Sequence, residues 1–323
     1  MINNFKNILV TGGMGFIGSN FLKLLLSKGN INITVIDNLT EGSCLTNLSS
    51  DIHKLINFEK CSIGDNRCKS ILKENNIECV INFAAQTHVD RSIKDPEFFF
   101  KNNVLDTIRF IENCRDYFNE KSNYHFHHVS TDEVYGSLDL NQNGFTESSP
   151  LRPSNPYSAS KASIDLYLQS IKKTFGFKYT TSFCSNNFGP NQMKEKFIPS
   201  VIESLKKKKK VLVYGDGSNI RDWIYVDDHC DGIFTIINSG ITGENFNIGG
   251  KNELTNIELV EKIFKIMFPK KNLSHTNYVE FIEDRKGHDF RYAVCNEKIE
   301  RLLKWRSNRN FHEDLTQTVN SYL

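Results

Sequence analysis

A tyrosine and a lysine four positions apart, Tyr157 and Lys161, are the first residues of this sequence that could carry chemistry. Their spacing places both side chains on one face of a helix, which the sequence predicts over residues 157–175. An ammonium group beside a phenol stabilises the phenolate and lowers the pKa of the phenol. The pair is therefore predicted to take a proton from a substrate hydroxyl group, with Tyr157 as the general base.

A second stretch with suitable chemistry is STDEVYG, residues 130–136. It follows residues 125–129, whose apolar tendency predicts a buried strand. Thr131, Asp132 and Glu133 then stand at the end of that strand, where a hydroxyl and two carboxyl groups could move protons on a small substrate. An Asp-Glu pair taken alone is more typical of a solvated loop, so this prediction depends on the neighbouring motifs.

The elements that must position these residues begin with a glycine-rich turn near the N-terminus. A predicted strand at residues 6–11 leads into GGMGFIG, followed by an amphipathic helix at residues 19–27. In this context Gly12 allows the tight turn, Gly15 lets the backbone approach a pyrophosphate, and Gly18 lets helix and strand pack closely. The N–H groups at the start of the helix favour phosphate binding.

A second predicted strand, residues 32–36, ends at Asp37, about twenty residues after the glycine turn. An acid at this place accepts hydrogen bonds from both ribose hydroxyls of NAD, and its charge disfavours the extra phosphate of NADP. The strand, the turn, the helix and Asp37 together predict a dinucleotide-binding unit that prefers NAD.

Strands and helices continue to alternate, with strands predicted at residues 58–63 and 78–83 and a helix between them at 67–75. This alternation predicts an α/β fold with a Rossmann-type, doubly wound parallel sheet. We assign residues 1–180 to an NAD-binding domain and residues 181–323 to a smaller, interleaved C-terminal substrate domain. Residues 225–238 are expected to return and pack on the first domain.

Composition excludes several classes of protein. The formal net charge of +2 gives no argument for a nucleic-acid partner. No apolar run approaches the roughly 20 residues of a membrane span, and the N-terminus carries no leader pattern. The eight cysteines form no CxxC pair, which favours reduced thiols. We therefore expect a soluble, cytoplasmic protein without a membrane or nucleic-acid partner.

Three histidines, at positions 125, 127 and 128, resemble a metal cluster at first sight. In a strand, His125 and His127 share one face while His128 points to the other, and no carboxylate stands at ligand spacing on that strand. We therefore predict no metal site.

The sequence resembles the extended short-chain dehydrogenase/reductases, and within them the nucleotide-sugar 4,6-dehydratases. Related epimerases and decarboxylases share the glycines and the YxxxK pair but generally lack the Asp-Glu pair, which makes that pair the discriminating feature. The resemblance covers nearly the whole chain, in the stretches TGGMGFIGSN, AAQTHVDRSI, HHVSTDEVYG, NPYSASKA, CSNNFGPNQ, EKFIP, YGDGSNIRDWIYVDDH, NIGGKNELTN and DRKGHDFRYA.

The resemblance implies a role for each catalytic candidate. Tyr157 is the base on the sugar 4-hydroxyl, Lys161 is its partner and also contacts the cofactor ribose, and Thr131 hydrogen-bonds the reacting oxygen. Asp132 protonates the departing C6 hydroxyl, and Glu133 removes the C5 proton. Oxidation at C4 acidifies the C5 hydrogen, water is lost, and hydride returns to C6. NAD is therefore expected to stay tightly bound and to be regenerated in each cycle.

The resemblance also implies two sets of binding residues. Those expected to contact the cofactor are Gly12, Gly15, Phe16, Ile17, Gly18, Asp37, Asn38, Ser62, Ile63, Ala84, Ala85, Asn102, Tyr157, Lys161 and Asn187. Those expected to contact a nucleotide sugar are Thr87, Thr131, Asn186, Lys196, Phe197, Val213, Tyr214, Arg221, Asn256, Arg285 and His288. Arg221 is expected to hold the pyrophosphate, and a structural pair with Asp222 is the alternative for it.

The chain departs from the family pattern in three places. Ser62-Ile63 replaces an Asp-Ile pair that contacts adenine, the segment after the second strand (residues 38–48) is short, and Gln86-Thr87 alters a substrate-side loop. None of these changes affects Tyr157 or Asp132.

Several functions stay open from sequence alone. The main prediction is conversion of dTDP- or UDP-glucose to the 4-keto-6-deoxyhexose. The alternatives are a UDP-N-acetylglucosamine 4,6-dehydratase, with or without inversion of C5, a nucleotide-sugar 4-epimerase, and a non-catalytic NAD-binding protein. The resemblance also implies a homodimer, in which helices around residues 98–117 and 157–175 pair across the interface as a four-helix bundle.

Overall fold

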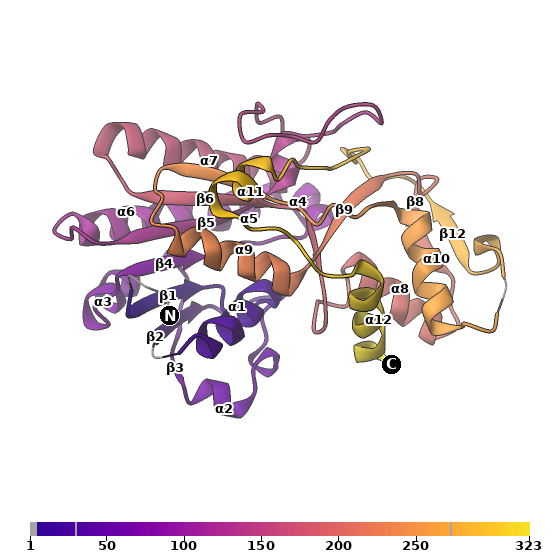
Figure 1. Ribbon diagram of the computed structural model, residues 1–323, viewed down its shortest axis with the longest axis horizontal. Helices are drawn as coiled ribbons and strands as arrows, with labels where there is room; N and C mark the ends of the chain where they lie inside the picture. The colour runs from indigo at the N-terminus through magenta and orange to yellow at the C-terminus, as the bar shows by residue number, and fades with distance from the viewer. Residues whose placement is uncertain (1–4, 30, 272) are drawn as a thin grey trace.

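A parallel sheet of seven strands organises the part of the chain that the computed structural model describes, residues 5–29, 31–271 and 273–323 (Figure 1). The strand order is β10-β6-β5-β4-β1-β2-β3, and every neighbouring pair is parallel. The expected Rossmann-type sheet is confirmed. Its strands are β1 (Asn7–Thr11), β2 (Asn32–Asp37), β3 (Ile56–Lys60), β4 (Cys79–Asn82), β5 (His125–Thr131), β6 (Tyr179–Cys184) and β10 (Glu244–Ile248).

Helices cover both faces of this sheet because its strands are apolar on both sides. Along β1, Val10 points into one core cluster and Leu9 into the other, and both side chains are fully buried. Full burial of such a side chain contributes about 1.5–3 kcal/mol. One cluster contains residues of α1 (Phe16–Ser27), α9 (Val226–Asn238) and α11 (Glu297–Leu303), and the other contains residues of α3 (Arg67–Glu74), α6 (Thr107–Phe118) and α7 (Pro156–Phe175).

The strand order reverses between β1 and β4. From β1 the chain proceeds through β2 to β3 on one side, and from β4 through β5 to β6 on the other. The crevice at the carboxyl ends of the strands at such a switch point is where doubly wound sheets bind ligands. The motifs at residues 12–18 and 130–136 both follow strands that end at this edge.

The second lobe has its own core, on the right of Figure 1. Two small sheets support it, and neither belongs to the central sheet. The strands are β7 (Asn186–Phe188), β9 (Ile220–Tyr225) and β11 (Glu253–Thr255) in one, and β8 (Val211–Tyr214) and β12 (Val279–Ile282) in the other. The helices are α8 (Phe197–Lys206), α10 (Asn256–Met267) and α12 (Phe311–Tyr322).

The two lobes are interleaved. Helix α9 returns to the central sheet, where the thiol of Cys230 lies 3.8 Å from the carbonyl oxygen of Ile17 in α1. Strand β10 also joins this sheet, along the outer edge of β6, which the sequence analysis did not anticipate. The boundary drawn at residues 180/181 falls inside β6. The division into two domains stays a prediction.

Several predicted elements have different bounds in the structure, and the helix expected at 19–27 begins at Phe16. The strand expected at 58–63 is β3, Ile56–Lys60, and residues 62–63 lie beyond it in a turn where Asp65 accepts a hydrogen bond from Ser62 N at 3.1 Å. The helix expected at 98–117 is interrupted by a π-helical turn, η2. The shorter helices are α2 (Ser50–His53), α4 (Val89–Lys94), α5 (Pro96–Phe100), η1 (Leu45–Asn47), η2 (Lys101–Asp106), η3 (Asp132–Tyr135) and η4 (His275–Asn277).

Candidate active site

A cavity of about 280 Å³ opens at the switch point and brings the sequence motifs together. It is lined by all five catalytic candidates, Thr131, Asp132, Glu133, Tyr157 and Lys161. The expected cofactor residues line it as well, namely Gly12, Gly15, Phe16, Ile17, Gly18, Asp37, Asn38, Ser62, Ile63, Ala84, Ala85, Asn102 and Asn187. Of the expected sugar-nucleotide residues outside the catalytic group, Thr87, Asn186 and Lys196 line it.

The glycine turn is shaped by close backbone contacts. Gly12 has a φ of +67°, and a Cβ atom there would lie 2.8 Å from Ala84 N. A Cβ atom at Gly18 would lie 2.3 Å from Gly12 O. Gly15 precedes α1 without a side-chain cap, so the first N–H groups of the helix stay available to an anion.

Asp37 is buried at the end of β2 and holds the turn in place. One carboxylate oxygen accepts hydrogen bonds from Met14 N at 2.9 Å and Ser43 Oγ at 3.2 Å, and the other accepts one from Leu39 N at 2.8 Å. Each carboxylate oxygen can accept more than one hydrogen bond, so this arrangement is compatible with ribose hydroxyls as further donors.

The chain turns sharply after β5 and directs Asp132 and Glu133 into the cavity. Thr131 Oγ1 accepts a hydrogen bond from Glu133 N at 3.3 Å and begins the short helix η3. Gly136 ends it with a φ of +89°, and a Cβ atom there would lie 2.5 Å from Arg152 O. Asp132 Oδ2 and Glu133 Oε2 are buried and have no hydrogen-bond partner in the described part of the chain. Unpartnered oxygens at such a place fit a ligand that would supply the missing hydrogen bonds.

The surroundings give the two carboxyl groups different acidities. Burial raises the pKa of Asp132 well above its usual range, and the charges of Glu133 and Asp222 raise it further. Burial also raises the pKa of Glu133, but the positive charges of Arg285, Arg221 and Lys196 oppose this rise. Burial therefore favours the protonated form of Asp132. Three cations oppose this effect at Glu133, whereas Arg221 is the cation that opposes it at Asp132.

Tyr157 stands in the first turn of α7, where its backbone N–H donates to Ser92 Oγ at 3.1 Å. Burial raises the pKa of Tyr157 well above its usual range, and the charge of Glu133 raises it further. A hydrogen bond with Thr131 acts in the opposite direction. The net direction for Tyr157 is therefore a rise, and the expected lowering of its pKa by Lys161 stays a prediction.

Lys161 Nζ donates to Val129 O at 2.8 Å and lies 3.2 Å from His128 Nε2. Burial lowers the pKa of Lys161 to about 8, while the charge of Asp165 opposes this fall. Burial raises the pKa of Asp165 to about 7, which the charge of Lys161 opposes. Lys161 is thus close to losing its proton near neutral pH.

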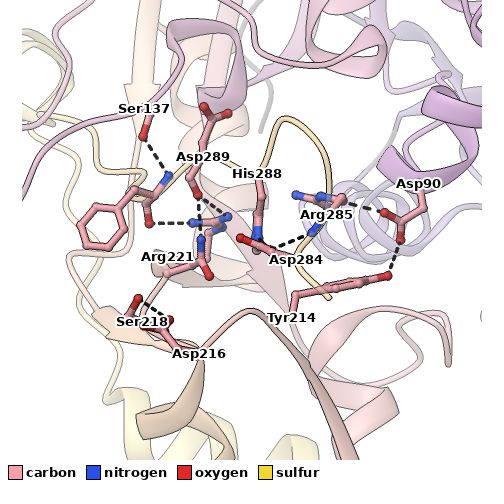
Figure 2. Close-up of polar contacts among 12 residues, drawn as sticks. Asp90, Ser137, Tyr214, Asp216, Ser218, Arg221, Asp284, Arg285, His288 and Asp289 are labelled. Carbon is pink, nitrogen blue, oxygen red and sulfur yellow. Dashed lines mark hydrogen bonds and ion pairs between the residues drawn. The ribbon is translucent and has the colours of Figure 1, made fainter. Parts of the chain in front are cut away.

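The other residues predicted to bind a nucleotide sugar lie outside the cavity lining, in the second lobe. Figure 2 shows Arg285 and Tyr214 directed at Asp90, with Arg285 Nε 3.9 Å and Tyr214 OH 3.3 Å from its carboxylate oxygens. His288 Nδ1 lies 2.6 Å from Asp284 Oδ1. The others are Phe197 at the start of α8, Val213 buried in the core of that lobe, and Asn256 at the start of α10.

Arg221 is held by backbone carbonyls instead of Asp222 (Figure 2). Its guanidinium donates to Asp289 O at 3.0 Å and Ile220 O at 2.7 Å, and it lies 4.3 Å from the centre of the Tyr292 ring. Asp222 accepts hydrogen bonds from the backbone of the loop that follows β10. The alternative of a structural pair with Asp222 is therefore wrong.

Sequence reasoning missed several residues at the mouth of the cavity. Arg91 Nη2 lies 2.5 Å from a carboxylate oxygen of Glu41 and 2.5 Å from one of Glu195. These three residues, here called the clasp, connect the loop after β2, helix α4 and the segment before α8. Beside it, Lys196 Nζ donates to Thr87 O at 2.9 Å. Arg91 stands in the AAQTHVDRSI stretch, but its partners are set by the tertiary fold.

Two further findings concern the described residues. In these ranges no group of three or more His, Cys, Asp or Glu side chains is arranged to hold a metal ion. His125 and His127 both bond to Thr180 Oγ1, at 2.7 and 2.9 Å. None of the described helices has the length and apolar character needed to cross a membrane.

Comparison with known proteins adds to this geometry. The family model for GDP-mannose 4,6 dehydratase matches residues 9–318. A dTDP-glucose 4,6-dehydratase of Escherichia coli is 39% identical over 334 residues, which cover 98% of this chain and 92% of that protein. This chain belongs to the nucleotide-sugar 4,6-dehydratases.

Solved structures agree with this family. A dTDP-glucose 4,6-dehydratase from Streptomyces venezuelae, with NAD and TYD bound, has a TM-score of 0.91 and 38% identity, with 98% of this chain and 96% of that chain covered. A UDP-glucose 4-epimerase from Thermotoga maritima has a TM-score of 0.87 at 28% identity, with 98% of each chain covered. Dehydratases and epimerases thus share the fold. The Asp132-Glu133 pair is the feature by which this sequence resembles the dehydratases and differs from the epimerases.

Proposed function

We propose that the protein is an NAD-dependent nucleotide-sugar 4,6-dehydratase that converts dTDP-glucose or UDP-glucose to the 4-keto-6-deoxy sugar. The observation that carries this proposal is the joint placement of Asp132, Glu133, Tyr157 and Lys161 on one cavity. An epimerase has no use for a buried proton donor beside a second carboxylate. The relatives named dTDP-glucose 4,6-dehydratase favour the thymidine donor.

The cavity fits NAD as its cofactor. The glycine turn leaves room for a diphosphate, the uncapped start of α1 faces it, and Asp37 stands where an adenosine ribose would lie. When bound, NAD supplies the acceptor for the C4 hydride and the donor that returns hydride to C6. Ser62, Ile63, Ala84 and Asn187 would complete its contacts.

Tyr157 would accept the proton of the 4-hydroxyl while C4 is oxidised, with Thr131 hydrogen-bonded to the same oxygen. Because burial raises the pKa of Tyr157, its phenolate needs positive charge nearby. Lys161, one helical turn further along α7, is the residue placed to supply it.

Asp132 and Glu133 would divide the loss of water between them. Glu133, which three cations help to keep ionised, would remove the acidified C5 proton. Asp132, which burial keeps protonated, would give its proton to the departing C6 hydroxyl. Glu133 would then return a proton to C5 as hydride reaches C6. The proton that Tyr157 took from the 4-hydroxyl would pass to Asp132 and restore its acid form, so the net change is the loss of one water.

Arg221, Arg285 and Lys196 would bind the sugar diphosphate. The positive charges of all three lower the pKa of Glu133, so they face the same part of the cleft. Guanidinium groups suit phosphate oxygens in a bidentate geometry. Phe197, Tyr214, Asn256 and His288, all in the second lobe, would line the nucleotide end beyond the diphosphate. Val213, whose side chain is fully buried in the core of that lobe, would contribute only its backbone.

We also infer a homodimer and a cytoplasmic location. Leu105, Leu166 and Phe175 are 55%, 55% and 57% exposed, which fits an apolar surface on η2 and α7 that a second copy would cover. Light scattering should give twice the chain mass, and the double variant Leu105→Glu, Leu166→Glu should have the mass of one chain.

The inferred cytoplasmic location is supported by the cysteines. All eight are free thiols, which fits a reducing compartment.

The test of the function is incubation of the purified protein with dTDP-glucose, UDP-glucose and UDP-N-acetylglucosamine separately, without added reductant. Mass and proton NMR of the products should show loss of one water from a glucose donor. NMR will also show the configuration at C5. A product of unchanged mass would identify an epimerase, and no product from any donor would contradict the proposal.

A further inference from the structure

A row of buried polar side chains connects β1 with Lys161. Thr11, Asn82, His128 and Lys161 are 0%, 0%, 1% and 4% exposed. Thr11 Oγ1 donates to Asn82 Oδ1 at 2.5 Å, Asn82 Nδ2 lies 3.1 Å from His128 Nδ1, and His128 Nε2 lies 3.2 Å from Lys161 Nζ. The row crosses the neighbouring strands β1, β4 and β5 and ends at the amine that supports Tyr157.

The direction of these hydrogen bonds follows from Thr11, the first residue of the row. Ala84 N–H donates to Thr11 Oγ1 at 3.4 Å, so the Thr11 hydroxyl is free to donate to Asn82 Oδ1. The amide nitrogen of Asn82 can only donate, so His128 Nδ1 must accept. Burial lowers the pKa of His128 well below its usual range, which keeps the ring neutral. The ring proton therefore sits on Nε2, facing Lys161.

This proton affects the form of Lys161. A neutral amine can donate to Val129 O and accept from His128 Nε2–H at the same time. An ammonium group has no lone pair and would meet the Nε2–H with a proton of its own. Reversing the imidazole tautomer would require the Asn82 amide to flip. The flip would place its Nδ2 2.5 Å from Thr11 Oγ1, a distance that suits an O–H···O bond and is too short for an N–H···O bond. The row therefore favours the amine.

Asp165, one turn after Lys161 on α7, acts in the opposite direction. Its Oδ2 accepts from Ser130 Oγ at 2.8 Å, while its buried Oδ1 lies 4.0 Å from His128 Nε2 and has no hydrogen-bond partner in the described ranges. Its negative charge raises the pKa of Lys161.

Other titratable groups also face this place. The charge of an ionised Cys184, at the end of β6, raises the pKa of Lys161, as the charge of Asp165 does. Tyr157 lies on α7 with Lys161. The negative charges of Glu133 and Asp132, both in η3, raise the pKa of Tyr157. Of these groups, His128 is the one that directs a hydrogen-bond donor at the Lys161 amine.

We propose that His128 and Asp165 are positioning residues with opposite effects on Lys161, His128 favouring its amine and Asp165 its ammonium form. Their balance sets the alkaline limit of the pH range in which Lys161 can support Tyr157. The effect on rate rests on the proposed function, whereas the protonation of Lys161 is a property of the chain itself.

The test is a pH titration of the full-length protein with NAD bound, labelled with ¹³Cε-lysine and followed by NMR. The Lys161 signal is identified by its loss in Lys161→Met. Asp165→Asn should lower the Lys161 midpoint by about one pH unit or more. His128→Phe should raise it by about half a unit, since one opposing hydrogen bond is removed. Shifts in the same direction, or no shift in either variant, would overturn the proposal.

Two further variants separate this effect from a general loss of packing. His128→Gln keeps an acceptor for Asn82 and a donor for Lys161, so it should restore the wild-type midpoint. His125→Phe removes another buried histidine of β5, which bonds to Thr180 and not to Lys161, and should leave the midpoint unchanged. If His128→Phe does not fold, Asn82→Leu combined with it removes the orphaned amide and should give the same upward shift.

The pH dependence of kcat for formation of the 4-keto sugar gives the kinetic counterpart. Its alkaline limb should move down in Asp165→Asn and up in His128→Phe. If no donor is converted while the NMR midpoints move in opposite directions, the proposed function fails and this inference stands. If the enzyme is active and the midpoints stay fixed, only this inference fails.

Discussion

Tyr157 combines a buried phenol with a base role that needs a phenolate. Replacing it with phenylalanine removes the hydroxyl and preserves the packing of the first turn of α7. We expect Tyr157→Phe to lower kcat by about 100- to 10,000-fold, the usual contribution of general acid–base catalysis. Stopped-flow measurement of C4 oxidation gives the rate, and the rate is expressed per bound NAD so that a lost cofactor contact is separated from a lost base. A variant that oxidises C4 at the normal rate would exclude Tyr157 as the base.

Asp132 and Glu133 belong to a later step. The double variant Asp132→Asn, Glu133→Gln keeps the shape of both side chains and removes their proton chemistry. C4 oxidation should proceed while the loss of water slows by about 100-fold or more. The absorbance of reduced nicotinamide should therefore accumulate on addition of the nucleotide sugar. Full dehydration by this variant would contradict the assigned roles.

The catalytic residues could be predicted from sequence because their chemistry lies in local motifs. STDEVYG and YxxxK place each side chain relative to its own strand end or helix start, and the fold only has to bring those ends together. The hydrogen-bond partners of the Lys161 amine could not be predicted in this way. The carbonyl of Val129 and the ring of His128 belong to another element and engage the amine.

At the scale of elements, the clasp connects three segments that surround the cavity mouth. Each ion pair is partly exposed, so each contributes only about 0.2–1 kcal/mol. Arg91→Ala removes both ion pairs and should consequently speed NAD release about two- to thirtyfold without unfolding the protein. Lys94→Ala, an exposed residue at the end of the same helix α4, is the matched control. Each variant is loaded with the reduced cofactor, and release is followed by the fall of nicotinamide fluorescence after dilution. Equal release rates in the two variants would contradict the role of the clasp.

Element prediction succeeded where a short pattern decides the structure and failed where distant partners decide it. The glycine turn, β1 and α1 follow from residues 6–27 alone. The polar-rich strand β10, with the sequence ENFNI, carries no strong signal of its own and is a strand because β6 offers it an edge. The π-helical turn η2 within a predicted continuous helix is likewise beyond a periodicity argument.

At the scale of the whole molecule, buried histidines make stability depend on pH. His229 Nδ1 lies 2.9 Å from Asn187 Oδ1, and its Nε2 is buried without a partner in the described chain. Burial lowers the pKa of His229 to about 3 and that of His125 to about 4. An unfolded histidine titrates near 6.5, so below this pH the unfolded state binds more protons. Stability from these groups is complete above about pH 6.5 and is lost as the pH falls toward their folded pKa values.

His229→Gln keeps a donor for Asn187 and removes the titration. The free energy of unfolding of the wild type should therefore fall more steeply with acidification than that of the variant, by about 1.4 kcal/mol per pH unit. Asp165 has the opposite effect on the pH dependence of stability, because burial raises its pKa to about 7. It is present in both the wild type and the variant, so its contribution cancels in the comparison. Urea unfolding between about pH 6.5 and 4.5 measures the difference in slope. The exposed His312→Gln is the control, and equal slopes in all three proteins would refute the prediction.

The return of β10 to the central sheet also determines the order in which the protein can be completed during synthesis. After β6 has left the ribosome, its outer edge has no neighbour until residues 244–248 follow. The intervening residues build β7, β8 and β9 of the other lobe. A nascent chain of intermediate length thus exposes an open strand edge, the kind of surface on which chains associate. The central sheet is thus completed only after several elements of the other lobe have been made. A fragment cut at residue 180 would end inside β6 and lack β10, the strand that pairs with the outer edge of β6.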